Sequence, residues 1–240
     1  MSRAESPPRE QGETQMAKQV THFELPPSLL DASDDRAVAV LGAYYRPLSG
    51  GGGGYTGGQF DTFDPSGTRS ASANTYTADD LVAVTLLSVE VPGRAAMEML
   101  VLQRRRFEEL LENIGPDRDM AKEASVAESD FRPAWELWRA LSELPRLGPT
   151  TVSKLMARKR PRLIPIFDSV IDRTVLGGTG VLWSPMHAAL RENDPTLHER
   201  LLRVRARAGL DESISVLRVF NVLAWMDGSG HSQNVLESQS

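Results

Sequence analysis

The sequence predicts an all-α protein, on three observations. Apolar residues recur every three or four positions through most of residues 77–228, as they do on one face of a helix. Side chains that cap helices stand before these stretches, above all Thr77, which is followed three positions later by Asp80. No pair of strand patterns and no internal repeat is present. With 240 residues, 40% of them hydrophobic, the chain can bury the core of one helical domain or of two closely packed helical lobes.

The chain divides into four segments. Residues 1–33 are largely polar and have no helical period at their start, so we expect them to be disordered or extended. Residues 34–76 contain a short helix, at 34–45, and a glycine-rich loop. Residues 77–228 form the helical domain, and residues 229–240 are expected to be a disordered tail.

The glycine-rich loop begins with an unbroken run of glycines at residues 50–54. No P-loop lysine follows the run, so we expect a flexible linker or lid rather than a phosphate cradle. Tyr55, Phe60 and Phe63 come next, and we expect them to pack the loop onto the core. The alternative is that these rings stack on a base.

The first helix of the helical domain follows Thr77, and we expect it to end at Pro92 and Gly93. Because it is apolar nearly all round, we expect it to lie at the centre of the fold rather than at its surface. Further helices are predicted at about 96–114, 130–143, 149–158, from 168, from 184, from 194, and at 213–227.

The most informative stretch is residues 144–173. A helix that ends near Glu143, a tight turn through Gly148 and a second helix from Pro149 predict a helical hairpin. The backbone N–H groups at the start of the second helix are free to hold an anion such as phosphate. Asp168 follows Gly148 by twenty residues, after a short apolar piece bracketed by prolines, and opens the next helix.

This pattern resembles the helix-hairpin-helix superfamily of DNA glycosylases. The hairpin of that superfamily reads roughly L-P-G-x-G, and its catalytic aspartate stands in a D-[ST]-x-[IV]-x-R context at about this spacing. Here the hairpin reads LPRLG at 144–148 and the aspartate stands in DSVIDR at 168–173. The stretch LVAVTLLSVE at 81–90 looks like the early core helix of the superfamily. The resemblance implies a helix-hairpin-helix fold, DNA as a partner and Asp168 as the catalytic carboxylate.

Several positions depart from the superfamily pattern. Arg146 replaces the first hairpin glycine, and it carries strain if the turn requires a positive φ there. Thr150 occupies the position of the lysine that bifunctional members use as a nucleophile, so Schiff-base lyase chemistry has no nucleophile at that position. Glu90 corresponds to the glutamine that some members place in the gap left by a flipped base, and phosphate would repel it. Residues 55–227 are also similar to an uncharacterised actinobacterial family of unknown function.

Charge is distributed unevenly along the chain. The net charge is −5, but residues 144–210 hold twelve Lys and Arg against five Asp and Glu. This basic region is a candidate surface for DNA or another polyanion. The alternative is that these charges are solvated helix faces that balance an acidic neighbouring lobe. The candidate nucleic-acid or anion-binding residues lie in and after the hairpin: Gly148, Thr150, Thr151, Lys154, Arg158, Arg160 and Arg162.

Asp168 is the candidate catalytic carboxylate, because of its position after the hairpin and at the start of a helix. Glu90 is a weaker second candidate. At a helix N-terminus Asp168 could stabilise an oxocarbenium-like sugar as a base leaves, or orient the attacking water. The alternative is an ordinary N-cap, which contributes about 1 kcal/mol to stability.

Composition excludes several classes of site and location. The chain has no cysteine, which excludes disulfides, thiolate metal sites and the iron–sulfur cluster of several glycosylases. Four scattered histidines have no metal-ligand spacing, so we expect no metal and no cofactor. Without a membrane span or a signal-peptide pattern, we expect a soluble, cytoplasmic protein.

Three functions remain open from the sequence. The first is a non-catalytic nucleic-acid-binding protein that keeps the hairpin for phosphate contacts. The second is a monofunctional DNA glycosylase that uses Asp168 on a flipped nucleotide. The third is a helical domain that no longer binds DNA and instead binds a small molecule or a protein.

Overall fold

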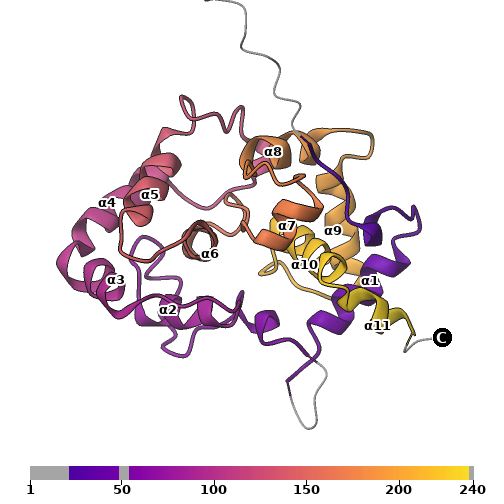
Figure 1. Ribbon diagram of the computed structural model, residues 1–240, viewed down its shortest axis with the longest axis horizontal. Coiled ribbons are helices and arrows are strands. Elements are labelled where there is room, and N and C mark those ends of the chain that lie inside the picture. Colours follow the sequence, from indigo (N-terminus) through magenta and orange to yellow (C-terminus); the bar gives the residue numbers. More distant parts are fainter. Residues whose placement is uncertain (1–21, 49–53, 238–240) are drawn as a thin grey trace, which may run out of the picture.

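The computed structural model describes residues 22–48 and 54–237, and every regular element in those ranges is helical (Figure 1). The predicted all-α class is therefore confirmed for the described residues. The disorder expected for the N-terminus falls largely on residues 1–21, which lie outside the described ranges, as do residues 50–53 of the glycine run.

The elements follow one another with short connections. Those of the first half are the 3-10 helix η1 (Pro27–Leu29), α1 (Asp35–Tyr44), the 3-10 helix η2 (Thr56–Gln59), α2 (Ala78–Thr85), α3 (Gly93–Met97), the π-helical turn η3 (Glu98–Leu102), α4 (Arg104–Ile114) and the 3-10 helix η4 (Met120–Lys122). Those of the second half are α5 (Arg132–Ser142), α6 (Pro149–Lys159), α7 (Ser169–Thr174), α8 (Trp183–Arg191), α9 (Leu197–Arg207), α10 (Val216–Gly228) and α11 (His231–Glu237).

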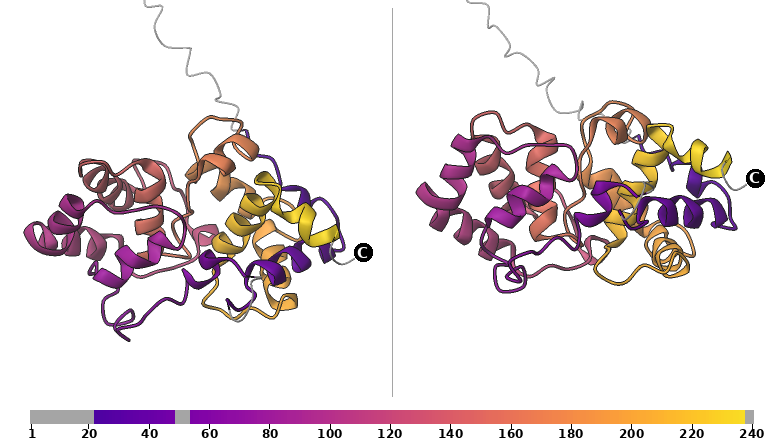
Figure 2. Two further views of the ribbon diagram at one scale, coloured as in Figure 1. Left: turned by 60° about the horizontal axis from the view of Figure 1, so that its bottom comes forward. Right: turned by 90° about the horizontal axis from the view of Figure 1, so that it is seen from below.

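The helices form two lobes, which Figures 1 and 2 show from three directions. In one lobe α5 packs against α4 and α6, and α6 also packs against α2. In the other lobe α10 is central and packs against α1, α7, α9 and α11. The early helix α1 thus lies among the last helices of the chain, and α6 and α7 lie where the lobes meet (Figure 1).

The predicted helical hairpin is present. Helix α5 ends at Ser142, and α6 begins at Pro149 with Gly148 as its N-cap. Arg146 has a φ of 61°, in the left-handed region that favours glycine. An arginine in this conformation costs roughly 1 kcal/mol, because its Cβ crowds the neighbouring carbonyl.

The first helix of the helical domain differs from its prediction. Its start is confirmed, because Thr77 and Asp80 form the capping box. It ends at Thr85 instead of Pro92, since a turn at 86–88 brings Ser88 to a φ of 60°. Gly93 opens α3 rather than closing this helix. The expected burial on all sides is also wrong, because Val82 is 47% exposed.

Both ends of the described chain contact distant parts of the molecule, and only the C-terminal one differs from its prediction. The predicted disordered tail at 229–240 contains α11, which packs against α1 and α10. Near the N-terminus, the backbone of Glu24 bonds to Val175 at 2.9 Å, and Ser28 donates twice to the Asp227 carboxylate. These contacts with distant residues hold segments whose own sequence has little helical pattern.

Candidate ligand-binding cleft

A cleft of about 370 Å³ lies between the two lobes. Its walls come from α1, η2, the turn that follows α2, the first turns of α6, the start of α7 and one face of α10. This volume is in the range of small-molecule sites. Of the predicted site residues, the cleft brings together Thr150, Lys154 and Asp168.

Asp168 both caps a helix and lines the cleft. Its Oδ1 accepts a hydrogen bond from the Val170 N–H at 2.8 Å, so the predicted N-cap of α7 is confirmed. The Ser153 hydroxyl holds the preceding residue, since it bonds to both the N–H and the carbonyl of Phe167. The side chain of Asp168 is 18% exposed, so the carboxylate stays accessible from the cleft.

Lys154 reaches the cleft from one turn into α6. Its Nζ lies 3.7 Å from Asp168 Oδ2 and donates to the carbonyl of Leu87 at 2.7 Å. Burial lowers the pKa of Lys154, and the Asp168 carboxylate opposes that shift. This one ammonium group therefore ties the turn after α2 to the start of α7 across the cleft.

A buried arginine that the sequence interpretation missed forms the floor of the cleft. Arg218 on α10 donates to Asp61 Oδ2 at 3.0 Å, to the Tyr44 hydroxyl at 2.9 Å and to the carbonyl of Gly57 at 2.7 Å. Burial would lower the pKa of Arg218, but Tyr44 and Asp61 outweigh burial, so its pKa is raised. The same guanidinium donates to Asn221 Oδ1 at 2.6 Å.

Aromatic rings form one wall of the cleft. Tyr55 stacks on Tyr44 with ring centroids 5.1 Å apart, and Trp225 meets Tyr55 edge-on at 5.8 Å. His231 of α11 lies against the ring of Trp225 at 5.1 Å. Gly57 is needed beside this wall, because a Cβ there would stand 2.1 Å from the Tyr44 hydroxyl. The stacking of Tyr55 on the core agrees with the prediction that the loop's aromatic residues pack inward.

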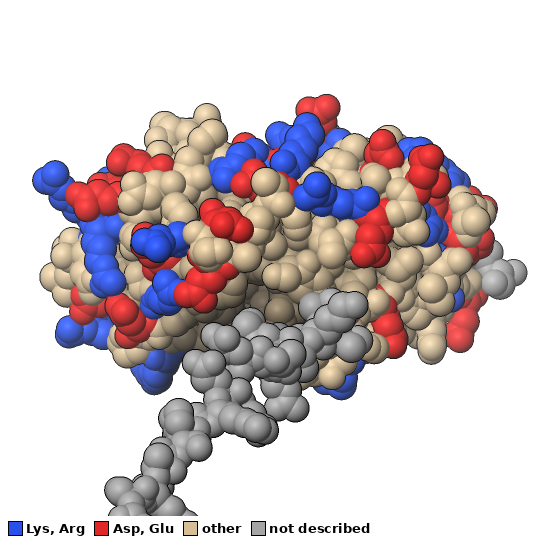
Figure 3. Space-filling model, turned by 90° about the horizontal axis from the view of Figure 1, so that it is seen from above, with Lys and Arg blue, Asp and Glu red and all other residues tan. Residues whose placement is uncertain are grey.

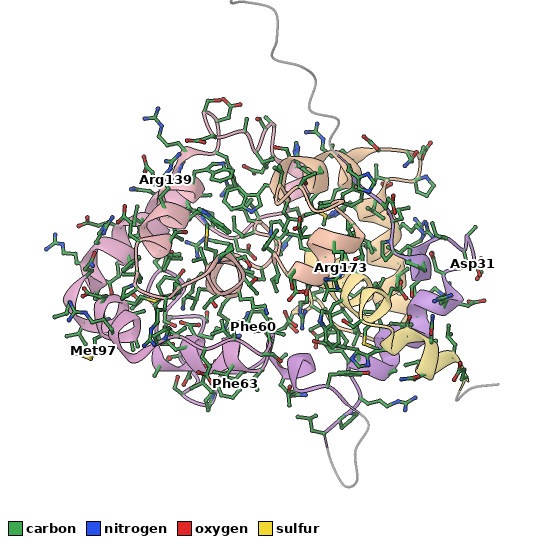
Figure 4. All side chains as sticks on the ribbon, viewed as in Figure 1. Asp31, Phe60, Phe63, Met97, Arg139 and Arg173 are labelled. Atoms are coloured by element: carbon green, nitrogen blue, oxygen red, sulfur yellow. The ribbon has the colours of Figure 1, made fainter. Side chains whose placement is uncertain are left out.

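The basic run after the hairpin is buried, not exposed. Arg158 is 2% exposed and donates to Asp80 Oδ1 at 3.1 Å and to the carbonyls of Phe60 and Phe63. Figure 4 labels these two rings, between α6 and the lower edge of the molecule. Arg160, also 2% exposed, donates to main-chain carbonyls that include those of Gly115 and Leu111. The sequence predicts that these side chains either contact phosphate or form solvated helix faces, and neither expectation includes their burial.

The other predicted residues lie apart from the cleft or at its rim. Arg162 is exposed and pairs with Asp119 at 2.8 Å. Thr151 is buried at 8% exposure, while Gly148 is exposed at the tip of the hairpin. Glu90 is exposed and does not line the cleft, so the structure does not bring the two candidate carboxylates together.

Two arginines of α9 are paired with the N-terminal segment. Arg200 bonds to Asp34 Oδ1, and Arg207 bonds to Asp35. On the face shown in Figure 3, Lys and Arg are interspersed with Asp and Glu, without a wide patch of one sign. Within the described residues, no group of three His, Asp or Glu side chains is arranged to hold a metal ion. No described helix is long and apolar enough to cross a membrane.

The sequence held a signal for the missed residues. Arg218 and Asn221 interrupt the otherwise apolar stretch VLRVFNVLAWM of α10 at a spacing of three, which places both on one helical face. Two polar residues inside an apolar helix predict a buried polar site, because each must find a partner.

Comparison with known families gives one match. A family of unknown function, DUF6308, matches residues 37–228, which is most of the chain. The chain belongs to DUF6308. The match covers both lobes and every residue that lines the cleft; His231, which lies against the Trp225 ring, is outside it. No curated protein and no solved structure matches the chain, so the functional argument depends on the geometry of the cleft.

Proposed function

We propose that the cleft binds a base or a nucleoside-like group, and that Asp168 supports cleavage of the N-glycosidic bond between base and sugar. The observation that carries the proposal is the double position of Asp168. One carboxylate oxygen caps α7, and the residue borders a cleft with an aromatic wall. Aromatic rings suit a planar base, and a fixed carboxylate suits a sugar that becomes positively charged.

The chemistry follows from the two oxygens of Asp168. Oδ1 is used by the Val170 N–H, while Oδ2 meets only the more distant Lys154 ammonium among the described residues. As the bond to the base lengthens, the sugar takes on oxocarbenium character, and a carboxylate beside it stabilises that charge or orients the attacking water. In this proposal Lys154 is a positioning residue, because it holds the carboxylate toward the cleft.

The hairpin gives the same ligand a second point of contact. Thr150 lies in the first turn of α6 and lines the cleft. The N–H groups of Thr150 and Thr151 have no protein acceptor within the described part of the chain. A helix N-terminus of this kind favours an anion, so a phosphate attached to the sugar would be held beside the cleft.

The test is Asp168→Asn, which keeps an N-cap of nearly equal quality. We expect the variant to melt within a few degrees of the wild type and to release no base from oligonucleotides that carry a panel of damaged bases. Asp211→Asn is the matched control, because Asp211 also accepts a backbone N–H, from Ser213 at 2.7 Å, outside the cleft. An abasic product at full rate from Asp168→Asn, or none from the wild type, would refute the proposal.

A second candidate is duplex binding through the hairpin without catalysis. The observation in its favour is the exposed tip, which carries Arg146 beside the unbonded N–H groups of α6. Phosphate contacts make log affinity fall linearly with log salt, so Arg146→Glu should weaken duplex binding and flatten that slope. Arg105→Glu, at an exposed site of α4, is the control. If wild type binds no duplex, the third candidate stands, a helical domain for a small molecule or a protein.

A further inference from the structure

We propose that Asn221 selects the ligand of the cleft by donating a hydrogen bond to an acceptor on its ring. The ligand class is then a heterocycle with a carbonyl oxygen at the edge that meets α10. This inference rests on the proposed function, since it concerns the same cleft, but it is a statement about binding and is tested without cleavage.

The orientation of the Asn221 amide is fixed by its partner. Arg218 Nη1 lies 2.6 Å from Oδ1 of Asn221, and a guanidinium has only donors to offer. The oxygen must therefore face Arg218, and the NH₂ group must point the other way. The orientation of the amide is assigned from the donors of Arg218, and not from the placement of the oxygen and nitrogen atoms in the Asn221 side chain.

Arg218 cannot turn away to accommodate a different orientation. Three of its other donors are held by Asp61, the Tyr44 hydroxyl and the carbonyl of Gly57, and its side chain is 4% exposed. Breaking this buried network would leave several unpaired polar groups, each costing about 1–3 kcal/mol. The protein thus holds the Asn221 amide in one orientation before any ligand arrives.

The donor side of Asn221 has no partner within the described residues. Asn221 is 7% exposed and lines the cleft, while its Nδ2 makes no hydrogen bond to the protein. A donor in this position requires an acceptor, which water supplies in the free protein and the ligand supplies in the complex. A ligand group that is itself a donor would leave two N–H groups facing each other.

The register of α10 places this donor beside the aromatic wall. Asn221 and Trp225 are four residues apart, and Arg218 is three residues before Asn221, so all three share one face of the helix. All three line the cleft together with Tyr55. A planar ring against this wall would turn one edge toward Asn221, which is where the carbonyl is required.

The experiment measures binding of free bases through the fluorescence of the cleft tryptophan. Wild type is titrated with hypoxanthine and with adenine. At C6 the first carries a carbonyl oxygen and the second an amino group, and N1 beside it donates in hypoxanthine and accepts in adenine. We expect hypoxanthine to bind about tenfold more tightly, as one buried hydrogen bond allows. Asn221→Asp keeps the size of the side chain and its contact with Arg218, but it replaces the donor with an acceptor. We therefore expect that variant to prefer adenine.

The controls separate selection from structure. Asn113→Asp makes the same change at an exposed site on α4 and should leave the wild-type preference unaltered. If Asn221→Asp does not fold, Asn221→Ser is used, and we expect it to lose the preference without reversing it. Equal binding of both bases by wild type, no binding of either, or an unchanged preference in the variants would overturn the inference. If Asn221→Asp reverses the base preference and the wild type cleaves no substrate, the inference about binding is supported and the proposed catalysis is refuted.

Discussion

Replacing Asp80 with asparagine should destabilise the protein strongly, because one buried carboxylate serves two buried cations. Asp80 is 2% exposed, and its oxygens pair with the Arg158 Nε at 3.1 Å and with the Lys159 ammonium. It also closes the capping box with Thr77. Asparagine keeps the shape but only one of the two accepting oxygens, so the change removes the charge and turns an NH₂ donor toward Arg158 on one side or toward Thr77 and Lys159 on the other.

The expected loss is about 3–5 kcal/mol of unfolding free energy, the cost of leaving a buried ion unpaired. For a chain of this length, that loss corresponds to a melting temperature lower by roughly 10 °C. Burial lowers the pKa of Lys159 and Asp80 opposes that shift, so Lys159 gives up its proton more easily in the variant. The loss should therefore be smaller above the pKa of Lys159 than at neutral pH.

Urea denaturation followed by circular dichroism measures this change. Asp79→Asn is the matched control, because among the described residues the Asp79 carboxylate accepts only from Ser66 and forms no ion pair with a buried cation. We expect the control to stay within 1 kcal/mol of the wild type. A loss of less than 1 kcal/mol in Asp80→Asn would show that Arg158 and Lys159 do not depend on this carboxylate.

Two further substitutions test the fold. Burial raises the pKa of Asp117 from 3.8 to about 6, so the stability it contributes is complete below pH 3.8 and is lost as the pH rises to 6. Asp117→Asn keeps an acceptor for the Arg162 N–H. We expect it to stabilise the protein by about 1–3 kcal/mol at pH 7 but not at pH 3.5, as measured by urea titration. An equal change in unfolding free energy at the two pH values would contradict this expectation. Arg146→Gly should stabilise by about 1 kcal/mol, because glycine adopts the φ of 61° without strain, and a lower urea midpoint would contradict it.

The local features of the chain could be predicted from its sequence. The hairpin between α5 and α6, the capping box of Thr77 and the cap of α7 by Asp168 all depend on residues within a few positions of one another. Capping and helical periodicity act over one or two turns, so a sequence window contains the whole interaction. The sequence left the φ of Arg146 open, and the structure places it at 61°.

The burial of the basic run could not be predicted in this way. The distant partners of Arg158 and Arg160 lie 45 to 98 residues earlier in the chain, from Gly115, which Arg160 contacts, to the Phe60 carbonyl, which Arg158 contacts. A run of lysines and arginines is usually a solvated surface, and nothing in residues 154–162 marks it as an exception. The loop that follows η2 supplies the carbonyls of Phe60, Phe63 and Ala73, and the end of α4 supplies those of Leu111 and Gly115, so the burial depends on tertiary packing.

The cleft also belongs to the tertiary structure. The sequence determined that Asp168 caps a helix after a hairpin, and this much is local chemistry. Only the packing of the two lobes placed Lys154 beside it and set α10 opposite, where Arg218 bonds to Gly57, 161 residues away. Contacts over such distances depend on how the helices pack together. Burial of the apolar faces decides the packing, and the buried polar residues then form hydrogen bonds with the groups that the packing places opposite them.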